Sequence, residues 1–199
     1  MIMPSNNTGG IVHYFAGKYP NKIGLLMSPQ GWRNPPYYMP YALDNGCFTK
    51  WEPDNFMGML QKASHHHKPL FVVVPDVVGD AEMTLKRWYD WAPKIKNLGY
   101  PLAFACQDGM DPQDVPNDAH CCFIGGTTQW KKSNAHKFKN VSPWLHIGRV
   151  NEWNSLKWAE WCGADSVDGT GFFRAKNYQY YDFIEWFEGR NYEQLQLFN

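Results

Sequence analysis

The 199-residue sequence predicts an α/β protein with the fold of a compact (β/α)8 TIM-like barrel, in one domain that spans residues 1–199. Short apolar runs alternate with helical patterns, which is typical of a parallel sheet. Eight such runs occur, and eight is the strand number of this barrel. Five of them end in acidic, amide or glycine residues, and the carboxyl ends of the strands in such a barrel open on one functional face.

The candidate strands are short and mostly apolar. They are residues 11–16, 23–27, 41–44, 70–75, 102–106, 121–125, 144–149 and 164–168. The first of these runs also fits an edge strand or a lid. Residues 28–40 form a long loop rich in proline and aromatic residues, and loops of this length in compact domains are usually functional or mobile.

Helices are predicted at residues 53–64, 80–97, 152–162 and 178–188. Pro53 suits a first helical turn, and Asp80 can cap the second helix. Gly163 can end the third helix. The stretch 108–119 reads as a loop with one turn of helix.

Composition narrows the classes of function. Aromatic residues make up 17% of the chain, which helps a small core and also suits stacking on nucleobases. The net charge is +0, so any contact with a nucleic acid needs a local basic patch. The five cysteines show no CxxC pair and no zinc-site spacing, and they are expected to be reduced and buried. The N-terminal residues do not resemble a signal peptide, which predicts a cytoplasmic protein.

Asp168 is the strongest candidate for a nucleophile or base. It follows a strand-like run, and the glycines of Asp-Gly-Thr-Gly are expected to leave room for a ligand. Asp165 is its rival, although on a strand it would point the opposite way. An aspartate before a glycine is also a common turn former, so both interpretations remain open.

Two further carboxylates follow predicted strands. Asp76 ends a buried run and therefore needs polar partners or solvent in a cleft. It can accept hydrogen bonds from a base edge such as that of guanine, or it can cap the next helix in competition with Asp80. Asp44 shares the loop Leu-Asp-Asn-Gly-Cys-Phe with the ring of Phe48, and Asp-Asn-Gly is also a strong turn former.

Amide and glycine residues follow the next two strands. Gln107 offers a donor and an acceptor that suit either a base edge or the backbone. Gly125 and Gly126 can present backbone N–H groups to a ligand carbonyl.

Cationic residues cluster once, in the segment 130–139, where lysines alternate with aromatic rings. The lysines are Lys131, Lys132, Lys137 and Lys139. The segment can hold a phosphate backbone, and a solvated helix face is the alternative. Arg149 and Arg174 each follow a strand end and are further phosphate-binding candidates.

His146 alternates with apolar residues, which favours a hydrogen-bonded core histidine over a catalyst.

Taken in chain order, these strand ends resemble the tRNA-guanine transglycosylase superfamily, whose members are (β/α)8 barrels that exchange guanine for a 7-deazaguanine. The resemblance spans about residues 40–175 and implies that the residues around the base are Phe48, Asp76, Gln107, Gly125 and Gly126. It places Asp44 at an acid position, Asp168 at the nucleophile and Asp165 at the preceding acid. The tRNA members continue into a Cys-rich zinc subdomain whose pattern is absent here. This compact form looks more like the DpdA-type 7-deazaguanine DNA transglycosylases of phages and bacteria.

The resemblance therefore implies a pentosyltransferase that replaces guanine in DNA by a 7-deazaguanine such as preQ0, through a covalent glycosyl intermediate on Asp168. Asp44 would transfer a proton or orient the sugar. No metal or redox cofactor and no membrane are implied. The resemblance leaves open a partner protein or a homodimer. The expected location is the cytoplasm, that of the host if a phage encodes the protein.

Three alternatives remain at this point. A tRNA-guanine transglycosylase would use the same chemistry with another docking surface. A hydrolase would remove the base and leave an abasic site. A non-catalytic nucleic-acid-binding barrel would use the acids only as turn residues.

Overall fold

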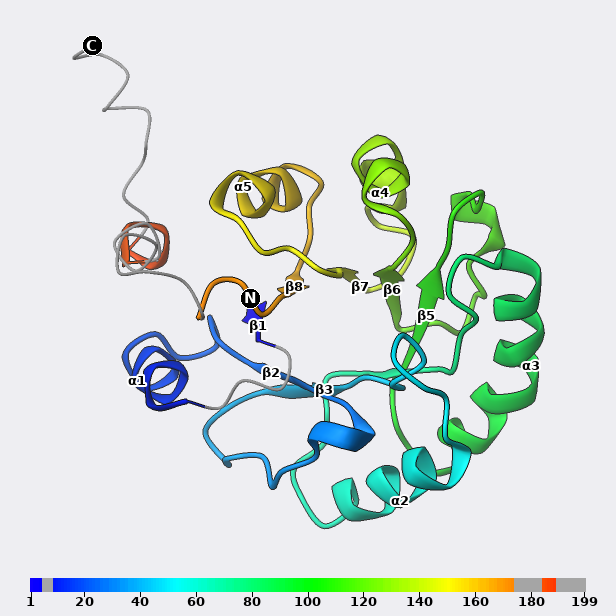
Figure 1. Cartoon of the computed structure of the whole chain (residues 1–199), viewed down its shortest axis with the longest axis horizontal. Helices are drawn as coiled ribbons and strands as arrows, with labels where there is room; N and C mark the ends of the chain where they lie inside the picture. Colours follow the sequence, from blue (N-terminus) through cyan, green and yellow to red (C-terminus); the bar gives the residue numbers. More distant parts are fainter. Residues whose placement is uncertain (5–8, 174–183, 189–199) are drawn as a thin grey trace.

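The computed structural model describes residues 1–4, 9–173 and 184–188. Within them, eight parallel strands form one sheet in the order β1-β8-β7-β6-β5-β4-β3-β2. A parallel bridge between Ile2 and Ile23 joins β1 to the segment before β2, so the sheet is a nearly closed barrel. Helices lie around the outside of the strands (Figure 1). The predicted (β/α)8 fold class is confirmed.

The strands are two to five residues long. They are β1 (Ile2–Met3), β2 (Leu25–Met27), β3 (Tyr41–Leu43), β4 (Val72–Val73), β5 (Leu102–Cys106), β6 (Cys121–Ile124), β7 (Trp144–Ile147) and β8 (Ser166–Asp168). The α-helices between them are α1 (Gly10–Lys18), α2 (Pro53–Ala63), α3 (Ala81–Asn97), α4 (Thr128–Asn134) and α5 (Trp153–Trp161). Short 3-10 helices lie at Pro29–Gly31, Pro112–Asp114 and Ala135–Phe138.

Seven of the eight predicted strands are present, and the prediction for residues 11–16 is wrong. That segment lies in α1, where Val12, Phe15 and Ala16 are buried at the i, i+3, i+4 spacing of one helix face. The true first strand is Ile2–Met3, which is too short to show any alternation.

The predicted helices at 53–64, 80–97 and 152–162 correspond to α2, α3 and α5. Asp80 caps α3, because its Oδ1 accepts the Met83 N–H at 2.9 Å. Gly163 follows α5 with φ +82°, a conformation that favours glycine. Of the predicted helix 178–188, residues 184–187 are helical, and 178–183 lie outside the described residues.

Side chains alternate along each strand between the barrel interior and the helix layer. The interior cluster is made mostly of small and apolar residues, namely Met3, Leu26, Ala42, Phe71, Val73, Ala103, Ala105 and Cys121. The larger cluster lies between strands and helices, where for example the rings of Trp88 and Phe104 meet at 5.3 Å. The inward-facing residues nearest the carboxyl ends of the strands therefore surround the mouth of the barrel.

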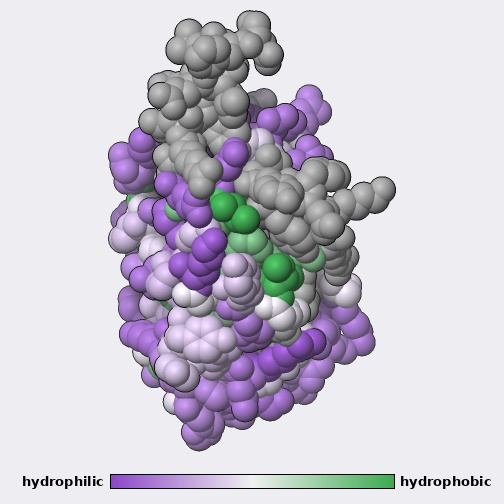
Figure 2. All heavy atoms as spheres, turned by 90° about the vertical axis from the view of Figure 1, so that its left-hand side faces the viewer, coloured by the Kyte–Doolittle hydropathy of each residue, from purple (hydrophilic) through white to green (hydrophobic). Residues whose placement is uncertain are grey.

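None of the described helices is both long enough and apolar enough to cross a membrane. The face of the molecule that carries α1 is largely hydrophilic, with only a few hydrophobic side chains at the surface (Figure 2).

Replacing Asp80 by alanine should lower the free energy of unfolding by about 1 kcal/mol, because α3 loses its N-cap. Chemical denaturation measures this change. Asp90, an exposed aspartate in the same helix, is the matched control, and D90A should shift stability by less than about 0.5 kcal/mol. Equal losses in the two variants would contradict the capping role.

Candidate functional site

A cavity of about 380 Å³ lies at the carboxyl ends of the strands, within the size range of small-molecule sites. Eight residues proposed from the sequence line it: Asp44, Phe48, Asp76, Gln107, Gly125, Gly126, Arg149 and Asp168. They follow or end six different strands, β3 to β8. The fold thus brings together side chains that lie far apart in the sequence.

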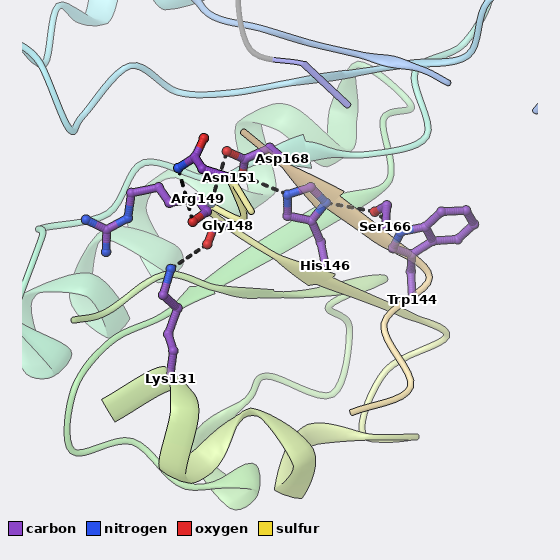
Figure 3. Close-up of polar contacts among 8 residues, drawn as sticks. All are labelled: Lys131, Trp144, His146, Gly148, Arg149, Asn151, Ser166 and Asp168. Carbon is purple, nitrogen blue, oxygen red and sulfur yellow. Dashed lines mark hydrogen bonds and ion pairs between the residues drawn. The ribbon is translucent and has the colours of Figure 1, made fainter. Parts of the chain in front are cut away.

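Asp168 ends β8 and is buried, with 6% of its surface exposed. His146 on β7 pairs in register with Ser166, so these two residues and Asp168 share the inner face. The Asp168 carboxyl group contacts His146 Nε2 through Oδ2 at 2.9 Å and accepts the Arg149 N–H through Oδ1 at 3.1 Å (Figure 3). Gly148 leaves room for it, because a Cβ there would lie 3.2 Å from Oδ2.

Arg149 lies at the rim of the cavity in a left-handed conformation, φ +59°, which is uncommon for a non-glycine residue. Its guanidinium donates to the Gly126 carbonyl and lies 5.3 Å from the centre of the Phe48 ring. Among the described residues that line the cavity, it is the only lysine, arginine or histidine. The ring of Phe48 is 69% exposed, so much of its surface is open to a ligand.

Asp44 follows β3 and is half-buried. Burial raises the pKa of its carboxyl group to about 7, and the charges of Asp168 and Asp76 add to this shift. Hydrogen bonds from the backbone N–H groups of Asn45 and Gly46 oppose it. Asp44 therefore accepts hydrogen bonds from the turn that follows it and also lines the cavity. A carboxyl group with this pKa can give or take a proton near neutral pH.

Asp76 is held by two side-chain amides. Its Oδ1 accepts from Asn45 Nδ2 at 2.8 Å, and its Oδ2 accepts from Gln107 Nε2 at 2.7 Å. The amide oxygens are fixed in turn, because Asn45 Oδ1 accepts the Cys47 N–H and Gln107 Oε1 accepts the Gly79 N–H. Burial raises the pKa of Asp76, although both amides favour its charged form. The Asp76 carboxyl is thus a preorganised acceptor at the wall of the cavity.

The glycines are used differently from the sequence-based expectation. The Gly125 N–H donates to the Cys106 carbonyl at 3.0 Å, so the expectation that it is free for a ligand is wrong. Gly126 has φ +51°, and a Cβ there would lie 2.6 Å from Asp108 Oδ1. Both residues line the cavity, where the lack of a side chain keeps space open.

The glycines after Asp168 serve the neighbouring loop. A Cβ on Gly169 would lie 2.1 Å from the Val150 carbonyl oxygen, and one on Gly171 would lie 2.7 Å from the Asn151 carbonyl oxygen. The sequence predicts that these glycines make room for a ligand. Gly169 also lines the cavity, so the expectation holds in part for this residue, whereas Gly171 makes room for the chain that follows β7.

The predicted basic patch is divided by the fold. Lys131 is only 4% exposed, and its Nζ donates to the Gly148 carbonyl, so its assignment to a surface patch is wrong. Burial lowers the pKa of Lys131 to about 8. Lys132, Lys137 and Lys139 are exposed but do not line the cavity. Arg174 lies outside the described residues.

Asp165, which lies just before β8, and Asp168, at the end of β8, have opposite orientations. Asp165 is exposed at the amino end of the strand, where its Oδ2 accepts the Leu145 N–H at 2.8 Å. It does not line the cavity, whereas Asp168 does. The geometry therefore favours Asp168 for any chemistry in this site.

Sequence reasoning missed several residues that build the site, among them Asn45, which holds Asp76, and His146 and Phe123, which lie behind Asp168. His146 is a buried, hydrogen-bonded core residue as predicted, but its partner is the carboxyl group of Asp168. Phe123 lines the cavity and stacks on His146 with ring centroids 4.5 Å apart. The register of β6, β7 and β8 brings Phe123, His146 and Asp168 together. This register cannot be read from the sequence.

No family model matches this chain, and no curated protein matches it either. Among the described residues, no group of three or more His, Cys, Asp or Glu side chains is placed to hold a metal ion. The candidate site is therefore defined by its own geometry.

The Asp44 carboxyl group should titrate near pH 7 in a ¹³C NMR experiment. In D168N its midpoint should fall toward the ordinary value of 3.8, because a charge that raises the Asp44 pKa is removed. D90N is the control for a remote charge. An unchanged midpoint in D168N would contradict the proximity of the two acids.

The same pKa shift predicts the pH dependence of stability. Between about pH 4 and pH 7 the folded protein keeps a proton on Asp44 that the unfolded chain has released. The contribution of Asp44 to the free energy of unfolding should therefore fall as the pH rises through this window. Urea denaturation should show a flatter pH profile for D44N.

Proposed function

We propose that this protein is a pentosyltransferase that replaces guanine in DNA by a 7-deazaguanine base such as preQ0. The observation that carries the proposal is the gathering of three carboxyl groups with distinct environments on one cavity: Asp44, Asp76 and Asp168. Each suits a different task in base exchange. The preference for DNA comes from the resemblance to the DpdA-type proteins.

Asp76 suits the recognition of the base. An ionised carboxylate offers about four acceptor positions, and the two amides that hold Asp76 use two of them. The remaining positions can accept the N1–H and the exocyclic amine of guanine. Gln107 then acts by holding Asp76 as well as by lining the cavity. The exposed ring of Phe48 can stack on the base, a contact worth about 1–3 kcal/mol.

Asp168 and Asp44 suit the exchange itself. The target nucleotide must leave the base stack before C1′ can enter the cavity. An oxygen of Asp168 then bonds to C1′ as the bond from C1′ to N9 of guanine breaks. Guanine leaves with the electron pair and takes a proton from Asp44. The incoming 7-deazaguanine returns a proton to Asp44 and attacks C1′, which releases Asp168.

Incorporation of a labelled base tests the proposal directly. The protein is incubated with radiolabelled guanine or preQ0 and with either duplex DNA or tRNA, and label in DNA is the expected result. Label in tRNA alone would indicate the same base-exchange chemistry with tRNA, and not DNA, as the substrate. Abasic sites without incorporation would indicate a hydrolase. The absence of both incorporated label and abasic sites would indicate a non-catalytic barrel.

The D168N variant should bind preQ0 like the wild type and lose incorporation altogether, because an amide is nearly isosteric with a carboxylate but is a poor nucleophile. Calorimetry measures binding, and the label assay measures exchange. Asp165 provides the matched control, since D165N alters a carboxylate outside the cavity and should retain exchange. Wild-type turnover in D168N would exclude Asp168 as the nucleophile.

The D76A variant should weaken the binding of guanine and preQ0 by about 1.5–3 kcal/mol for each charged hydrogen bond lost. This corresponds to roughly a 10- to 150-fold rise in Kd for one bond. D80A removes a carboxylate four residues away that lies outside the cavity, and it should leave Kd unchanged. An unaltered affinity in D76A would exclude Asp76 from base recognition.

A further inference from the structure

A line of polar side chains runs along the inner face of β7 and β8 behind Asp168 (Figure 3). Trp144 Nε1 donates to Ser166 Oγ at 2.7 Å, and Ser166 Oγ lies 2.7 Å from His146 Nδ1. His146 Nε2 lies 2.9 Å from Asp168 Oδ2. The line alternates between β7 and β8 because all four side chains point to the inner face of the barrel. Ser166 and His146 are 1% and 0% exposed.

The donors and acceptors of this line set its direction. An ionised Asp168 carboxylate can only accept, so the His146 Nε2 that faces it carries the proton. An indole N–H can only donate, so Ser166 Oγ accepts from Trp144, and its own hydroxyl proton is available to Nδ1 of a neutral His146. A neutral His146 ring then accepts at Nδ1 and carries its proton on Nε2. That proton faces Asp168 Oδ2. The other tautomer would place a nitrogen lone pair against the carboxyl oxygen and leave the serine proton without its acceptor.

His146 cannot touch a ligand in the cavity. The ring of Phe123 stacks on it at 4.5 Å, and the ring of Phe71 meets it edge-on at 5.3 Å. Phe123 lines the cavity, and His146 does not. Any effect of His146 on chemistry must therefore pass through Asp168.

The second carboxyl oxygen of Asp168 is fixed by the segment that follows β7. The Arg149 N–H reaches Oδ1, and the preceding Gly148 carbonyl is anchored by the buried Lys131. One donor thus comes from the backbone and the other from the buried line. Fixing a reacting group from both sides matters, because a misplacement of about 1 Å can cost on the order of 10²-fold in rate.

We infer that His146 is a positioning residue: the relay from Trp144 through Ser166 fixes its tautomer, and its Nε2–H holds the Asp168 carboxylate in the orientation for attack. The attack itself rests on the proposed function. The hydrogen-bond relay does not rest on it, so the two can be tested separately.

The relay is tested by ¹H–¹⁵N NMR of protein labelled at histidine, at about pH 8, above the usual titration range of histidine. The His146 signals are identified by their loss in H146Q. We expect Nε2 to be protonated and Nδ1 to accept a hydrogen bond, with the Nδ1 signal shifting in S166A. A proton on Nδ1, in either a neutral or a charged ring, would overturn the inference whether or not the protein exchanges bases.

The positioning role is tested by the kinetics of base exchange. H146L should lower kcat about 10²-fold with KM for the base nearly unchanged, because His146 does not contact the ligand. H146Q keeps a side-chain N–H donor and should recover part of kcat. S166A, a small change, should lower kcat less than H146L does.

The control for packing is F71L, which alters the contact with His146 but none of its hydrogen bonds, and it should retain kcat. Wild-type kcat in H146L, or an equal loss in F71L, would overturn the positioning role. A wild-type protein without exchange activity would instead overturn the proposed function, and the NMR result would still decide the relay.

Discussion

The site depends on the register between β7 and β8. His146 lies opposite Ser166, and side chains alternate between the two faces of a strand. This pairing places Asp168 on the inner face and beside Gly148, where no side chain competes for its space. A slip of one residue would turn Asp168 toward the helix layer and would turn Asp165 inward. The position of the Asp168 carboxyl group therefore depends on how β7 and β8 pair.

The same geometry creates an electrostatic cost at the mouth. Carboxyl groups of Asp44, Asp76 and Asp168 line one cavity, and burial, together with the charges of the other two, raises the pKa of Asp44. Two amides offset the cost at Asp76, and Asp168 contacts His146 on β7 and accepts the N–H of Arg149 just after β7. Unfavourable charge that is held in place by a rigid scaffold is typical of sites that carry out chemistry.

Two further features show that the β7 and β8 ends are built as one unit. Arg149 adopts a left-handed conformation and presents its N–H to Asp168, and Gly169 allows the Val150 carbonyl to approach closely. Beneath them the buried amine of Lys131 holds the Gly148 carbonyl. A lysine that looks like part of a surface patch in the sequence therefore supports the site from inside.

The sequence by itself determined the barrel, most strands, and the acids and amide at the strand ends, because parallel strands must bring their carboxyl ends to one face. Only the tertiary structure decided that residues 11–16 are helical, since the competing strand Ile2–Met3 pairs with residues distant in the sequence. It also decided the burial of Lys131 and the contact of His146 with Asp168. Those contacts follow from register and from helix packing, which local patterns do not encode.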